Sequence, residues 1–192
     1  MSGTAPARPQ RALRLFIIFA LVFYSNTVLT TVFFSDPAMV RESPISFVLQ
    51  NVIGLVAFVA LARRRRAALA VLHAPSIPIL MALAGFSVLW AANPALTGRR
   101  ALLLMMTTSV GILLATEFSP RERLEVIGWA IGTVMVLSFV AAVAFPLVGV
   151  EQGAFRGAWR GVFSQKNGLG RGAVFALLVF AAYRGAVRRN RV

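Results

Sequence analysis

The residues of this sequence best suited to chemistry are the cations of a glycine-rich segment, residues 155–170, which reads FRGAWRGVFSQKNGLG. Arg156, Arg160 and Lys166 stand here among aromatic residues, and Asn167 comes just before an apolar run. Ammonium and guanidinium groups bind phosphate, and two planar guanidinium forks can hold a diphosphate between them. The segment is therefore a candidate anion site.

A second pair of cations, Arg99 and Arg100, is expected in the first turn of an apolar helix near residues 98–116. Lys166 and Arg171 bracket the expected start of the last apolar helix. Helix N-termini attract anions through their free N–H groups, so the two helix starts would form a strong anion site if they converge. The alternative is that these arginines extend to lipid headgroups, as cations near the ends of spans often do.

The other polar residues give less direct signals. Asn167 is expected to cap the last helix, and Glu151 is either a base or a partner of Arg156. The sequence has no cysteine, and its single histidine, His73, has no second histidine or carboxylate near it in sequence. We therefore expect no metal site and no cofactor, and the catalytic residue stays unknown.

The composition is that of a membrane protein. Of the 192 residues 58% are hydrophobic, and the mean hydropathy is +0.78. The chain carries 20 Lys and Arg against 6 Asp and Glu, a net charge of +14, but the arginines lie mostly between apolar runs. They are therefore interpreted as topology signals and contacts to membrane lipid, and no nucleic-acid partner is expected.

The apolar runs predict an all-α, polytopic integral membrane protein with about six transmembrane helices. These helices make up a domain over residues 15–187, between a disordered tail at 1–14 and a basic tail at 188–192. The expected spans lie near 15–34, 45–62, 77–92, 98–116, 124–148 and 168–187.

Local signals mark the ends of these spans. Ser43-Pro44 and Ser119-Pro120 are typical helix starts, and four arginines at 63–66 end the second span. Asn93-Pro94 is interpreted as a turn, with the next helix starting at Thr97 or Gly98. The glycines of residues 155–170 favour a loop.

The distribution of arginines predicts the topology. The side that collects the four-arginine run, Arg14, Arg121 and Arg184 carries about twice the positive charge of the other. Both termini are therefore expected in the cytoplasm, and residues 155–170 on the outer face of a bacterial inner membrane.

Two segments together suggest a family. Residues 156–170 resemble the RGxFxxKNxLG-like signature of the O-antigen ligase and bacterial polysaccharide polymerase (Wzy-type) superfamily, and look closest to its ExoQ-like branch. Residues 86–102, FSVLWAANPALTGRRAL, are similar to a second segment of that family, a span ending in Ser-x-x-Trp-Ser-x-(Asp/Asn)-Pro followed by an arginine. Both segments occur in the family's order and on the expected outer face.

The resemblance implies a membrane glycosyltransferase that acts at the outer leaflet on glycans carried by undecaprenyl diphosphate. Such enzymes join the glycan to another glycan or to lipid A core, without a nucleotide sugar or a metal. By position, Arg99 or Arg100, Arg156 and Arg160 match arginines that hold the diphosphate in the family. Lys166-Asn167 match its Lys-Asn pair.

The resemblance spans nearly the whole chain but only the first half of a typical member. Members of the family continue with further spans and a large periplasmic loop that bears a histidine thought to be catalytic. We therefore expect the N-terminal part of a polymerase or ligase of exopolysaccharide or O-antigen (lipopolysaccharide) biosynthesis. Its partners would be a separate C-terminal half and other polysaccharide assembly proteins. The alternatives are a polysaccharide export or transport component and an inactive truncated remnant.

Overall fold

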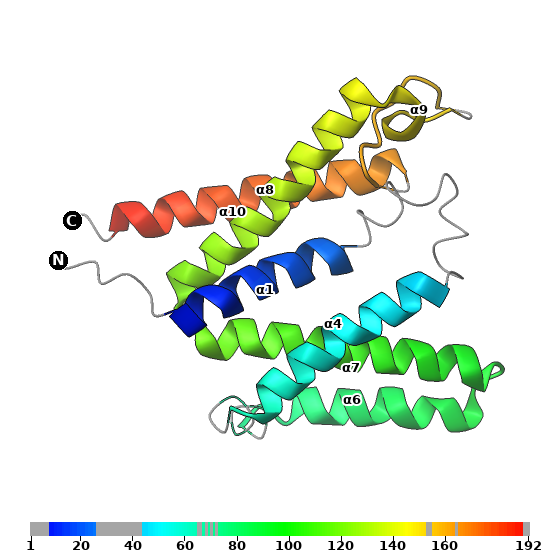
Figure 1. The fold of residues 1–192 in the computed structure, drawn as a ribbon, viewed down its shortest axis with the longest axis vertical. Helices are drawn as coiled ribbons and strands as arrows, with labels where there is room; N and C mark the ends of the chain where they lie inside the picture. Colours follow the sequence, from blue (N-terminus) through cyan, green and yellow to red (C-terminus); the bar gives the residue numbers. More distant parts are fainter. Residues whose placement is uncertain are drawn as a thin grey trace. The chain divides into compact units, whose positions relative to one another are not determined.

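The computed structural model describes residues 8–25, 44–64, 67, 69, 71, 73–152, 155–163 and 165–189. Within these residues the regular elements are all helices, which confirms the predicted all-α class (Figure 1). The chain divides into two compact units. One comprises Met1–Ser46 with Pro120–Val192, and the other comprises Phe47–Ser119.

The first unit is organised around one long helix. It contains α1 (Arg8–Tyr24), α8 (Pro120–Ala144), α9 (Pro146–Gly149) and α10 (Lys166–Arg189). Helix α8 contacts each of the other three helices. The expected tail at 1–14 is helical from Arg8 onward, because Arg8–Arg14 continue the helix that carries the apolar run.

A stripe of small and branched residues forms the packed face of α8. Val126, Ala130 and Val134 follow one another at intervals of four residues, and each is at most 5% exposed. Residues four apart lie on one face of a helix, so these side chains form a continuous seam. Helix α1 presents Ile17 and Ala20, both fully buried, at a matching helical spacing. Small residues of this kind allow membrane helices to approach closely.

The second unit contains most of α4 (Pro44–Ala62) together with α6 (Ser76–Phe86), the 3-10 helix η1 (Ser87–Trp90) and α7 (Pro94–Glu117). Helices α6 and η1 pack along α7. Helix α4 also approaches α7 closely, because a Cβ atom on Gly54 would overlap the side chain of Met106. Glycine at this position permits the contact between the two helices.

The start of α7 differs from the prediction. The Asn93 side chain accepts a hydrogen bond from the Leu96 N–H at 3.1 Å, and Pro94 is the first helical residue. The dipeptide therefore begins the helix instead of forming a separate turn, since Asn is a good N-cap and Pro suits the first helical position. Arg99 and Arg100 consequently lie in the second turn of α7, and not in its first. Helices α4 and α8 do begin at Pro44 and Pro120, as predicted.

Three helices of the described part are long and apolar enough to cross a membrane: α7, α8 and residues Lys166–Arg188 of α10. They indicate that the protein associates with a membrane. The spans expected near 45–62 and 77–92 correspond to shorter apolar helices, Val48–Ala62 and Ser76–Trp90. The span expected at 15–34 begins in α1, and its residues from 26 onward lie outside the described part. The count of about six spans therefore stays a prediction.

Within each unit, helix ends that the sequence assigned to one side of the membrane lie together. In the first unit Glu125, near the start of α8, accepts hydrogen bonds from Arg14 of α1 at 2.9 Å and from Tyr183 near the end of α10 at 3.2 Å. In the second unit, Arg64 after α4 pairs with Glu117 at the end of α7 at 3.2 Å. Helices α1 and α8 therefore run in the same direction and α10 runs opposite to α8, whereas α4 and α7 run in the same direction. The side that faces the cytoplasm stays a prediction.

Candidate functional site

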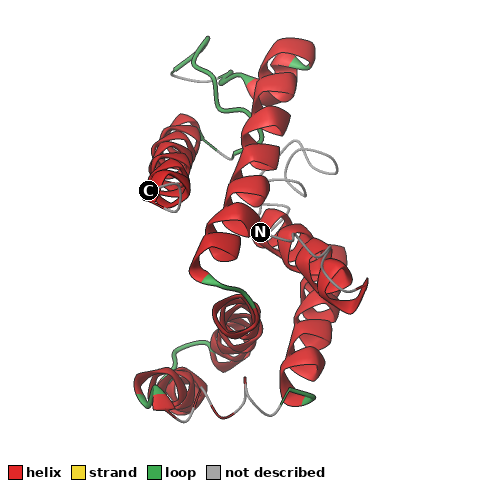
Figure 2. Ribbon diagram, turned by 90° about the vertical axis from the view of Figure 1, so that its left-hand side faces the viewer, coloured by secondary structure: helices red, strands yellow, loops and turns green. Residues whose placement is uncertain are grey.

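The glycine-rich segment forms a folded loop between α9 and α10, at one end of α8 (Figure 2). Val150 and Trp159 face each other in an isolated antiparallel bridge, and the Glu151 N–H donates to the Ala158 carbonyl at 2.9 Å. The N–H groups of Arg160 and Gly161 both donate to the Gly149 carbonyl at 2.9 Å. The backbone therefore closes on itself, and the predicted loop is confirmed.

Glycines allow this loop to fold and to sit on α8. Gly157 and Gly161 have φ values of +90° and +62°, a region that residues with a Cβ rarely adopt. A Cβ on Gly161 would overlap Ser138, and one on Gly149 would overlap the backbone at Ala141. The loop thus lies directly against the last turns of α8.

The two arginines of the loop have different surroundings. The Arg160 Nε donates to the Val148 carbonyl at 2.7 Å, and the residue is half-buried. Arg156 lies at an exposed turn. A guanidinium has five N–H donors, so Arg160 keeps donors for a ligand while one bond fixes its orientation. Arg156 is the less constrained of the two.

The start of α10 also differs from the prediction. The helix begins at Lys166, so Asn167 lies within the first turn instead of capping it. The Glu151 carboxylate accepts a hydrogen bond from the Lys166 N–H at 3.2 Å, and a negative charge is favourable at this helix end. The Lys166 Nζ lies 3.2 Å from the centre of the Phe155 ring, a cation–π contact within the same loop. The described partner of Glu151 is therefore the helix start, and not Arg156.

Aromatic residues hold the loop in place and also face outward. The Phe163 side chain packs against Gly168 and Gly172 of α10. Cβ atoms at these two glycines would lie 2.8 to 3.0 Å from it, so larger residues would not fit there without a shift. Trp159 makes an edge contact with Phe139 of α8, their ring centres 6.0 Å apart, yet it remains 50% exposed. An exposed Trp at the end of a membrane-length helix is typical of the membrane interface.

An open groove follows the first half of α10. Three polar residues, Lys166, Asn167 and Arg171, line one end of it, and the apolar Val174 and Leu178 lie further along the same helix with Phe175. Its volume is about 700 Å³. The sequence reasoning did not identify this groove, although the intervals between Asn167, Arg171, Val174 and Leu178 place them on one face of a helix.

The predicted site residues fall into two sets. Arg156, Arg160, Lys166 and Asn167 belong to one loop and the helix start that follows it, all in the first unit. Arg99, which is half-buried, and the exposed Arg100 belong to α7 in the second unit. A site that combines both sets stays a prediction. In the described part, no group of three or more His, Asp or Glu residues is placed to hold a metal ion.

We compared the chain with models of known protein families, with curated proteins and with solved structures, and none of the three comparisons gave a match.

Proposed function

We propose that this chain is the N-terminal part of a membrane glycosyltransferase of exopolysaccharide or O-antigen biosynthesis. It would polymerise or ligate glycans linked to undecaprenyl diphosphate at the outer face of the bacterial inner membrane. In this proposal about six spans cross the membrane, both termini are cytoplasmic, and the loop before α10 faces outward. The observation that carries the proposal is the open groove along α10, with cations at one end and apolar side chains of the same helix beyond them.

The groove suits an amphiphile with an anionic head. Lys166 and Arg171 supply two positive charges near the helix N-terminus, against one negative charge from Glu151, which accepts a hydrogen bond from the Lys166 N–H. Val174, Phe175 and Leu178 continue the groove along the helix. From Lys166 to Leu178 the helix rises about 18 Å, similar to the thickness of one bilayer leaflet. A polyprenyl diphosphate divides its polar and apolar parts in the same way.

The chemistry would take place at the polar end of the groove. The bond between the anomeric carbon and the diphosphate breaks, and a new bond forms from that carbon to the acceptor hydroxyl oxygen. The acceptor proton passes to a base that the described residues do not identify. Negative charge grows on the departing diphosphate, so fixed cations beside it stabilise the transition state. Arg160, which Val148 orients, and the exposed Arg156 are the loop residues for this role.

The described residues do not supply every component of this reaction. The resemblance places the catalytic loop of the family after the part that this chain matches. In this proposal the base and the acceptor site belong to that later part of the family architecture or to other polysaccharide assembly proteins.

Binding is the direct test of the groove. The full chain in lipid nanodiscs is titrated with undecaprenyl diphosphate and, separately, with undecaprenol, and complexes are counted by native mass spectrometry. We expect the diphosphate to bind more tightly, and Arg171→Gln to weaken it about tenfold, as for the loss of a hydrogen bond between charged groups. Arg188→Gln, at the opposite end of α10, is the matched control. Equal binding of both lipids, or equal effects of both variants, would contradict the proposal.

Polymer formation tests the loop. In cells that carry the complete assembly system, Arg156→Ala should abolish polymer while the amount of protein in the membrane is unchanged. Arg156 is preferred to Arg160 because Arg160 also bonds the Val148 carbonyl. Normal polymer length in the Arg156 variant would exclude the role in glycosyl transfer. Lipid-linked units that accumulate on the cytoplasmic side after gene deletion would instead favour export.

A further inference from the structure

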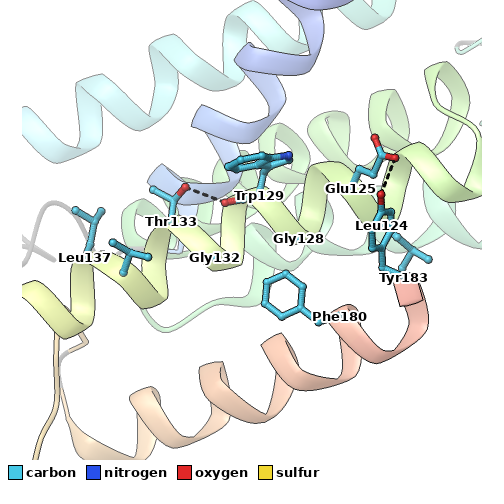
Figure 3. Close-up of a pocket in the computed structure, with 10 residues that line it drawn as sticks. Leu124, Glu125, Gly128, Trp129, Gly132, Thr133, Leu137, Phe180 and Tyr183 are labelled. Atoms are coloured by element: carbon cyan, nitrogen blue, oxygen red, sulfur yellow. Dashed lines mark hydrogen bonds between the residues drawn. The ribbon is translucent and has the colours of Figure 1, made fainter. Parts of the chain in front are cut away.

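A second groove lies between α8 and α10, remote in sequence from the cationic loop (Figure 3). It has a volume of about 670 Å³, within the range of about 300–1,000 Å³ typical of ligand sites. Gly128 and Gly132 leave one side of α8 without side chains, and Phe180 of α10 faces them. Ring carbons of Phe180 lie 3.6 Å from where a Cβ atom would lie at either glycine. The two glycines and this ring therefore form the floor of the groove.

Polar groups are concentrated at one end of this groove. Glu125 and Tyr183 line that end, and the Glu125 carboxylate is joined by Arg14 at 2.9 Å and Arg121 at 3.6 Å. The opposite end is lined by apolar side chains, Val136 and Leu137. An occupant should therefore have one polar head and one apolar tail.

The charge at the polar end favours an anion. Two guanidinium groups surround one carboxylate, which leaves one net positive charge. The Arg121 side chain is 47% exposed, and its Nε lies 3.6 Å from the Glu125 carboxylate. Its other N–H donors remain for a phosphate at the membrane surface, the usual partner of arginine there.

The length of the groove favours an acyl chain over a transmembrane helix of another protein as its occupant. From Glu125 to Leu137 helix α8 rises about 18 Å, whereas the hydrocarbon core of a bilayer is about 30 Å thick. A helix that crosses the membrane would need a groove along the whole core. An acyl chain that enters from one leaflet needs about half of it.

We infer that the groove between α8 and α10 binds one anionic phospholipid of the bilayer. The phosphate lies beside Arg121 and Arg14, and an acyl chain lies along the floor that Gly128, Gly132 and the Phe180 ring form together. In the predicted topology this lipid belongs to the cytoplasmic leaflet. The inference stands on this groove alone and does not depend on the proposed enzymatic function.

Tryptophan fluorescence provides the test, because Trp129 lines the groove and the sequence has only 3 Trp residues. The full chain with Trp90→Phe and Trp159→Phe is placed in nanodiscs that contain phosphatidylglycerol or phosphatidylcholine brominated at mid-chain. Bromine quenches tryptophan on contact. We expect half-maximal quenching of Trp129 at an about fivefold lower fraction of phosphatidylglycerol, the factor that one net positive charge provides near the membrane surface. Arg121→Gln should reduce this preference.

Two controls separate the groove from the rest of the surface. A chain that keeps only Trp90 reports ordinary lipid contact, because Trp90 is 66% exposed and Trp129 is 65% exposed. Thr133→Phe should fill the groove and remove the lipid preference, since the Thr133 hydroxyl bonds only within its own helix, to the Trp129 carbonyl. Val143→Phe adds a ring of the same size on α8 outside the groove and should change nothing.

Four results would overturn the inference. The first is equal quenching of Trp129 by both lipids, and the second is a lipid preference at Trp90 as large as that at Trp129. The third is a preference that survives Thr133→Phe. Absence of quenching by either lipid would show that protein fills the groove, and would also overturn it.

Discussion

The fit of the loop on α8 can be tested by comparing the same substitution at two glycines. Gly157→Ala and Gly161→Ala both place a Cβ on a residue with positive φ, at +90° and +62°. At Gly157 the new atom meets nothing within 4 Å, whereas at Gly161 it overlaps the side chain of Ser138. The first substitution therefore introduces backbone strain alone, and the second adds steric overlap.

The magnitudes follow from these two terms. A residue with a Cβ in the left-handed region costs about 1–2 kcal/mol. Overlap in a packed site adds about 1–3 kcal/mol. We therefore expect Gly157→Ala to destabilise the closed loop by about 1–2 kcal/mol and Gly161→Ala by about 2–5 kcal/mol. The second substitution should increase the open population by at least about fivefold more than the first, since the added overlap costs at least about 1 kcal/mol.

Trypsin cleavage provides the assay, because Arg156 and Arg160 both lie in the loop. When opening and closing are fast, the cleavage rate follows the equilibrium population of the open loop. The protein is held in nanodiscs, and the appearance of peptides that end at these arginines is followed by mass spectrometry. Ser138→Gly should restore part of the lost stability in the Gly161→Ala background, because it removes the atoms that overlap. Equal cleavage rates for the two alanine variants would refute the described contact between the loop and α8.

Two further predictions concern helix ends. Asn93→Ala should destabilise the second unit by about 1 kcal/mol, the usual effect of losing an N-cap, and denaturant unfolding of the purified protein will measure it. Asn93→Asp should have little effect, and an equal loss in both variants would exclude capping. Glu125→Gln should lower stability more than Glu117→Gln, because Glu125 has three described partners and Glu117 has one described ion pair. Since these groups are partly exposed and screened by solvent, we expect a difference of about 1 kcal/mol, and equal losses would contradict the arrangement.

The helix starts show what local sequence can and cannot predict. The Ser-Pro pairs at 43–44 and 119–120 correctly predicted helices that begin at the proline, because Pro suits the first helical position. Asn93-Pro94 was interpreted as a turn because the same dipeptide is common in turns and at helix starts. The hydrogen bond from the Leu96 N–H to the Asn93 side chain distinguishes a helix start from a turn, and this bond forms only once the helix is present.

The loop shows where contacts distant in sequence decide the structure. Its glycines predicted a loop, yet Asn167 was expected to cap α10. The Lys166 N–H is bonded instead by Glu151, a residue fifteen positions earlier. Likewise, Gly161 is required not only by its positive φ but also by Ser138 on α8, which a Cβ at 161 would overlap. Neither partner can be identified from the residues adjacent to the site.

The two grooves depend on the same helix in different ways, which explains why one could have been predicted and the other could not. The groove that begins at Lys166 is formed by α10 alone, since its lining residues all come from that helix. The groove at Phe180 exists only because α8 supplies Gly128 and Gly132 opposite the ring. Of the three membrane-length helices, α10 buries the smallest share of its residues. A helix so little covered by its own chain leaves apolar surface for lipid. In the two proposals above, the cations at Lys166 and beside Glu125 would determine which lipid headgroup is preferred.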